Sequence, residues 1–219
     1  MNKFVNDYID IIRFSKDVNT MLGNQTITIP GNKLIIVDIQ FRYYSGMQFT
    51  IEQFVNSLKE FKGDILYFYN GEAMGLESGQ DIVMWLMATT NDYSDEFRDL
   101  LRRIHWVEKG YGFYRDFMDN GGTEEEIKIV FTYLINNGYW STDELSEEEI
   151  NNFNIRETLK QQLKTQHYNI AIPNFDFHVL SDYDGATILG GSATECLLEI
   201  KILMNFMGLK YKEFKPFIY

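Results

Sequence analysis

The chain has 219 residues, of which 45% are apolar, and this is enough for one large domain with a substantial core. Its formal net charge of −12 opposes nonspecific binding to nucleic acid, because such binding depends on Lys and Arg neutralising phosphates. No stretch approaches the roughly 18 uninterrupted apolar residues of a membrane-spanning helix. The first residues lack the apolar run of a signal peptide, and a single cysteine suits a reducing compartment, so we expect a cytoplasmic protein.

The first third of the chain predicts a strand, a helix and a second strand. Residues 4–22 have the apolar spacing of a short amphipathic helix. The β-branched run over 34–37 predicts a strand buried on both faces, and residues 65–69 predict another. Between them, residues 50–61 predict a helix that begins after Thr50. Two such strands joined by a helix indicate a right-handed crossover in a parallel sheet.

The rest of the chain continues this alternation and adds a polar helical insertion. Residues 79–104 predict a pair of helices, and residues 105–108 predict a third strand. The insertion spans about 123–165 and contains an acidic helix over 146–164. The remaining expected elements are strands over 168–172, 187–189 and 209–214 and a helix over 196–207. Together these elements predict one α/β domain over 1–219, a three-layer sandwich with a mostly parallel, Rossmann-like central sheet.

Three candidate reactive residues fall at the ends of predicted strands. Ligands of parallel sheets bind beyond the carboxyl ends of the strands. Asp38 ends the first strand, Lys109 follows the third, and Cys196, the single cysteine, begins the helix after strand 187–189. A thiol at a helix N-terminus is favoured as thiolate by the helix dipole. An aspartate, a lysine and a cysteine can supply the base, the cation and the nucleophile for attack on a carbonyl.

Three short segments carry these residues in a fixed order. They are Val-Asp-Ile-Gln over 37–40, the lysine-containing segment Val-Glu-Lys-Gly-Tyr-Gly-Phe over 107–113, and a Gly-x5-Cys spacing that ends at Cys196. Together they resemble the signature segments of isochorismatase-like cysteine hydrolases. The resemblance implies hydrolysis of a small amide or related carbonyl compound, with Asp38 as base, Lys109 as stabiliser and Cys196 as nucleophile. We expect ligand contacts from Gln40, Asn70, Tyr111, Phe113, Gly190 and Gly191, and no cofactor.

Each candidate residue also has a structural interpretation. Free cysteine is among the most buried residue types, so Cys196 can be explained by packing alone. Lys109 can be a solvated loop lysine, and Gly190 and Gly191 can serve tight packing rather than a ligand. Glu195 places a carboxylate beside the thiol, which raises a thiol pKa. A non-catalytic relative that binds a protein partner or a small ligand through the same crevice is therefore a second hypothesis.

A metal-dependent hydrolase is the third hypothesis. Asp38, Asp182, Asp184 and Glu195 could bind Mg²⁺ if they converged. Asp182 and Asp184, however, precede the strand at 187–189, at the end opposite to Asp38. The three histidines lack the spacing of metal ligands, so we expect no metal site. The expected partners are a small-molecule substrate or a protein, with homo-oligomerisation left open.

Overall fold

A computed structural model describes residues 25–71, 78–110, 114–165 and 169–219 of the chain. Its centre is a five-stranded sheet in the order β3-β2-β1-β4-β5, and every neighbouring pair is parallel. The strands are β1 (Lys33–Val37), β2 (Asp64–Asn70), β3 (Ile104–Lys109), β4 (Ala186–Gly190) and β5 (Tyr211–Glu213). The expectation of a Rossmann-like α/β sandwich is confirmed. The helix expected over 4–22 lies outside the described residues.

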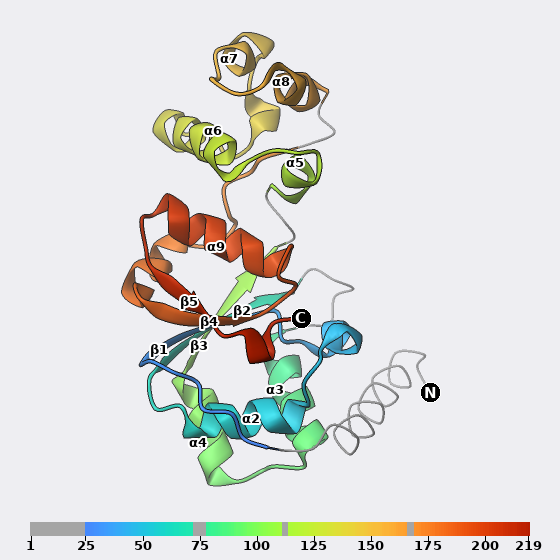
Figure 1. Cartoon of the computed structure of the whole chain (residues 1–219), viewed down its shortest axis with the longest axis vertical. Helices are drawn as coiled ribbons and strands as arrows, with labels where there is room; N and C mark the ends of the chain where they lie inside the picture. The colour runs from blue at the N-terminus through green and yellow to red at the C-terminus, as the bar shows by residue number, and fades with distance from the viewer. Residues whose placement is uncertain (1–24, 72–77, 111–113, 166–168) are drawn as a thin grey trace.

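Helices cover both faces of the sheet, as Figure 1 shows. One face is covered by α2 (Ile51–Glu60), α3 (Gly79–Thr90) and α4 (Asp95–Arg103), and the other by α9 (Cys196–Phe206). The alternation of side chains along each strand divides the core accordingly. The side chains of Ile35 and Val37 pack in the cluster that includes α9, whereas those of Leu34 and Ile36 pack in the cluster that includes α2, α3 and α4. All four are completely buried, as expected of a central parallel strand.

The segment between β3 and β4 forms a helical lobe above α9 (Figure 1). It contains α5 (Arg115–Asp119), α6 (Glu124–Asn137), α7 (Glu147–Asn151) and α8 (Glu157–Lys164). The remaining short 3₁₀ helices of the described chain are η1 (Phe41–Gly46), η2 (Thr142–Glu144), η3 (Phe177–Tyr183) and η4 (Lys215–Phe217). The lobe shares one hydrophobic cluster with α9 and that face of the sheet, so its helices extend the core of the domain.

Two expectations for this region were wrong. The acidic helix over 146–164 is two helices, because the chain leaves α7 at Asn151, buries Phe153 and restarts at Arg156. The strand over 168–172 is replaced, within its described residues, by a single antiparallel bridge between Ala171 and Ser141. Such a bridge gives main-chain N–H and C=O groups hydrogen-bond partners without a neighbouring sheet strand. The apolar residues of this segment therefore pack in the hydrophobic core without forming a strand.

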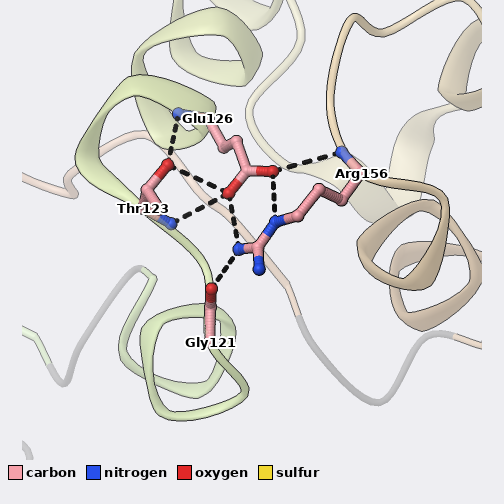
Figure 2. Close-up of polar contacts among 4 residues, drawn as sticks. All are labelled: Gly121, Thr123, Glu126 and Arg156. Carbon is pink, nitrogen blue, oxygen red and sulfur yellow. Dashed lines mark hydrogen bonds and ion pairs between the residues drawn. The ribbon is translucent and has the colours of Figure 1, made fainter.

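Glu126 fixes the point at which α8 begins. Its carboxylate completes the capping box at Thr123, accepting from the Thr123 N–H and hydroxyl. The same carboxylate accepts from the Arg156 main-chain N–H at 3.1 Å and from its guanidinium at 2.8 and 2.9 Å (Figure 2). The Arg156 guanidinium also donates to the Gly121 carbonyl. One buried carboxylate therefore joins the start of α6 to the start of α8.

We predict that this contact makes the stability of the folded protein depend on pH. Hydrogen bonds from Arg156 lower the pKa of Glu126 from 4.5 to about 2, against the opposing effect of burial. Because the folded-state pKa is depressed, the stabilisation is complete above pH 4.5 and is lost as the pH falls toward 2. Glu126→Gln should lower the urea midpoint clearly at pH 7, and the difference from wild type should shrink toward pH 2. Glu125→Gln, which changes an exposed neighbour, is the control and should have little effect at either pH; a constant difference across the pH range would contradict this account.

Gly190 allows β4 to lie against β1. It has a φ of +84°, and a Cβ atom there would lie 2.2 Å from the carbonyl oxygen of Val37. We predict that Gly190→Ala destabilises the fold by about 1–2 kcal/mol for the left-handed backbone plus about 1–3 kcal/mol for the clash. Gly208→Ala is a matched control, because Gly208 has a φ of +72° with open space around it. Equal losses of unfolding free energy in the two variants, measured by urea titration, would show that the close approach is unimportant.

Candidate functional site

The structure brings Asp38, Lys109 and Cys196 together at the carboxyl edge of the sheet. Asp38 follows β1, and Lys109 is the last residue of β3, two strands away. The Lys109 Nζ atom lies 2.7 Å from the Asp38 Oδ2 atom. Cys196 is the first residue of α9, and its thiol is within the electrostatic reach of both side chains. The three residues that the sequence singled out thus form one cluster.

The strand order explains why the cluster forms at this place. The chain passes from β1 outward to β2 and β3, then returns to the other side of β1 to form β4 and β5. The strand order therefore reverses between β1 and β4, and in such sheets ligands bind beyond the carboxyl ends of the strands at this point. Asp38 follows β1 at this point, and the turn from Gly190 to Cys196 follows the neighbouring β4.

The charged side chains of Lys109 and Asp38 are both buried at the edge of the sheet. The Lys109 side chain is 1% exposed and that of Asp38 is 0% exposed. Burial acts to lower the pKa of the Lys109 amine, but the charges of Asp38, Cys196 and Glu199 raise it, and the net shift is upward. Lys109 is thus held as an ammonium ion, and the interpretation as a solvated loop lysine was wrong.

Asp38 has an unusual main-chain conformation. Its φ of 49° places it in the left-handed region, which few residues other than glycine adopt. Three contacts hold it: its N–H donates to Phe68 O at 2.9 Å, its carbonyl accepts from the Tyr219 hydroxyl at 2.7 Å, and its carboxylate pairs with Lys109. Strained main chain that the surroundings enforce is concentrated at functional sites.

Glu199 belongs to the cluster, although the sequence analysis explained it by the helix dipole alone. Its side chain is 5% exposed, and its Oε2 atom lies 3.8 Å from Lys109 Nζ. It is three residues after Cys196, and this spacing places both side chains on one face of α9. That spacing was the signal available in the sequence. The carbonyl of Glu199 also accepts a hydrogen bond from the Tyr114 hydroxyl, which fixes α9 against the start of the lobe.

The Cys196 thiol is protonated in this environment. Burial raises its pKa, and so do the charge of Asp38, hydrogen bonding to Asp38 and the charge of Glu199. The charge of Lys109 lowers this pKa, but by less than the other effects raise it. The expectation of a thiolate stabilised by the helix dipole was therefore wrong for the resting protein. The physical reason is that burial of the thiol, together with the neighbouring Asp38 carboxylate, outweighs the helix N-terminus.

Two tyrosine side chains that the sequence did not indicate, Tyr67 and Tyr219, also lie near the cluster. The Tyr67 hydroxyl donates to Ile39 O at 2.5 Å, and its pKa is raised by burial and by Asp38. Burial, Asp38 and Cys196 raise the pKa of Tyr219. The Tyr219 main chain pairs with the Cys196 turn, since its N–H donates to Gly191 O and its carbonyl accepts from Ala193 N–H. Tyr219 was not predictable from spacing, because it follows η4, which no pattern indicated.

The expected ligand-binding residues take different places. Gln40 and Asn70 are buried, and the Gln40 amide makes two hydrogen bonds to the Asn70 main chain, at 2.7 and 3.1 Å. Gly190 packs against β1, and a Cβ atom on Gly191 would lie 3.4 Å from that of Cys196. Contacts of these four residues with a ligand stay predictions. Tyr111 and Phe113 lie outside the described residues.

The acidic residues of the metal hypothesis do not converge. Asp184 precedes β4, and its carboxylate accepts from the Lys210 N–H just before β5. Because the sheet is parallel, Asp182 and Asp184 lie at the edge opposite to Asp38. In the part of the chain that the structure describes, no three His, Cys, Asp or Glu side chains are arranged to hold a metal ion.

No protein-family model, curated protein or solved structure matches this chain. Among the described helices, none combines the length and the apolar character that crossing a membrane requires.

We predict that Asp38 controls the reactivity of the thiol. Wild-type protein should react slowly with iodoacetamide at pH 8, because the raised thiol pKa leaves little thiolate. Asp38→Asn removes the largest charge that raises this pKa, so alkylation should accelerate by roughly tenfold for each pKa unit recovered. Lys109→Met should slow it. Asp182→Asn is the control for the loss of one negative charge and should leave the rate unchanged; an equal acceleration in that variant would contradict the assignment.

Proposed function

We propose that this protein is a cysteine hydrolase of the isochorismatase-like type, acting on a small amide or a related carbonyl compound. The observation that supports the proposal is the buried 2.7 Å ion pair between Lys109 and Asp38 beside the only thiol in the sequence. Burying two charges is costly, and an α/β fold does not need an ion pair at this edge for stability. Clusters of buried ionisable groups in a crevice are typical of catalytic sites.

The geometry suits a mechanism in which the thiol is activated only during attack. As the Cys196 Sγ atom bonds to the carbonyl carbon, the thiol proton passes to the Asp38 carboxylate. The oxygen of the tetrahedral intermediate gains negative charge and is stabilised by the Lys109 ammonium. As the first residue of α9, Cys196 also carries one of the N–H groups that no preceding turn of helix satisfies, and this group can donate to the same oxygen.

The second half of the reaction restores the protein. The proton held by Asp38 passes to the substrate nitrogen, the carbon–nitrogen bond breaks, and ammonia or an amine leaves a thioester on Cys196. Water then attacks the thioester carbon and loses its proton to Asp38. The carbon–sulfur bond breaks, a carboxylic acid is released, and the thiol recovers a proton. Each group thus ends in its starting state.

The charge of the cluster favours neutral substrates. Two carboxylates, those of Asp38 and Glu199, lie near one ammonium, that of Lys109. Another carboxylate placed beside them would be repelled in this poorly solvated region. We therefore favour a small uncharged amide over an amide that carries an acidic group near the scissile bond.

The proposal is tested by measuring ammonia release from a panel of small uncharged primary amides. We expect turnover of at least one member, loss of about a thousandfold or more in Cys196→Ser and a comparable loss in Asp38→Asn. Asp182→Asn, at the opposite edge of the sheet, should retain full activity. A thioester on Cys196, detected as a mass increase after rapid acid quenching, would identify the nucleophile directly.

A non-catalytic protein that binds a ligand through the same crevice is the second candidate. The raised pKa of the Cys196 thiol favours it, because a protonated, partly buried thiol is what a structural cysteine shows. Binding of an amide without ammonia release, unchanged in Cys196→Ser, would support this candidate and contradict the hydrolase.

A further inference from the structure

A separate hollow lies between the end of α6 and the segment that leads into η3. Its volume is about 480 Å³, within the range of small-molecule sites. It is lined by Tyr139 and Trp140 on one side and by Phe175 and Phe177 on another. Asp38, Lys109 and Cys196 do not line it, so it is distinct from the thiol cluster.

The frame of this hollow is fixed by contacts with the sheet. The Phe175 ring lies 5.0 Å from that of Phe68 in β2, measured between centroids. The Asn174 side chain accepts a hydrogen bond from the Gly110 N–H, just after β3. The Phe177 ring stacks on His178 at 4.8 Å. This wall is therefore attached to the core.

The opposite wall presents the most exposed large apolar side chain of the described residues. Trp140 is 69% exposed, and its main-chain N–H donates to the Glu144 carboxylate at 2.8 Å. The Tyr139 hydroxyl donates to the Glu149 carboxylate at 2.9 Å, and hydrogen bonds from Ser146 and Tyr139 lower the pKa of Glu149 to about 2. Both aromatic residues are thus hydrogen-bonded to carboxylates, which place negative charge near this wall.

A second hollow continues the first and shares Asp176 and His178 with it. It has a volume of about 430 Å³ and adds Asp182 to the lining. Asp176 caps η3 through its Oδ1 atom, which accepts from the His178 N–H. Among the described residues, no lysine or arginine lines either hollow. The described lining thus combines aromatic faces with carboxylates, without a lysine or arginine opposite them.

We propose that this aromatic and acidic groove binds a small organic cation, an ammonium group attached to an apolar body. The aromatic rings attract a cation through their electron-rich faces and also cover its apolar part. The Asp176 carboxylate accepts hydrogen bonds from the ammonium group at the junction of the two hollows. The volume of about 480 Å³ is within the range of small-molecule sites, and the net charge of −12 raises the local concentration of cations.

Phenethylammonium is a suitable probe, with 2-phenylethanol as its neutral counterpart of similar shape. Titration calorimetry at pH 8 should show binding of the amine and at least about tenfold weaker binding of the alcohol. Asp176→Asn should weaken amine binding about tenfold while keeping the helix cap, because asparagine caps as well as aspartate. Trp140→Ala should weaken both compounds. Cys196→Ser should not change either affinity.

Asp95→Asn is the control for net charge, since Asp95 is an exposed residue of α4 on the other side of the sheet. It should leave the affinity for phenethylammonium unchanged. Equal affinity for the amine and the alcohol, or an unchanged affinity in Asp176→Asn, would overturn the proposal in favour of a purely apolar groove. So would binding of a lysine-containing peptide in the absence of any binding of the free amine, which would show a docking surface for a protein.

Discussion

A lysine and an aspartate that are both buried at the carboxyl edge of the sheet must stay paired, because a lone buried charge costs several kcal/mol. The pair of Lys109 and Asp38 therefore links β3 to β1 across the intervening β2, and Glu199 extends the link to α9. Three elements from distant parts of the sequence are positioned relative to one another by one ammonium ion. The Cys196 thiol takes its electrostatic environment from this arrangement.

The same arrangement raises the pKa of the thiol and, in the proposed hydrolase mechanism, also provides the base that accepts its proton. A carboxylate next to a thiol raises the cost of the free thiolate, but it is also the nearest acceptor for the thiol proton. In the proposed mechanism, a substrate carbonyl whose oxygen gains negative charge near Lys109 shifts the balance toward proton transfer from the thiol to Asp38. The proposed mechanism therefore needs no permanently ionised nucleophile, and a protonated thiol is less prone to oxidation.

The fold could largely be predicted from the sequence, because continuous apolar strands and capped helices alternate along it. The meeting of Asp38, Lys109 and Cys196 followed from the rule that parallel strands end at one edge. The predictions that were wrong concern features that depend on long-range contacts. The break at Arg156 depends on a carboxylate 30 positions away, and the raised thiol pKa depends on burial, which sequence spacing does not report. The place of Glu199 in the cluster could be inferred from its helical spacing to Cys196, whereas no spacing indicated Tyr219.

The pairing of β1 with β4 has a consequence for how the protein acquires its site. Thr187 at the start of β4 donates a hydrogen bond at 2.6 Å to the Pro30 carbonyl, 157 positions earlier in the chain. Closing so long a loop is entropically unfavourable and slow, so such contacts form after local ones. The half of the sheet formed by β1, β2 and β3 can assemble first and already holds Asp38 and Lys109. Cys196 joins them only when β4 docks, so the thiol becomes shielded in the last stage of folding.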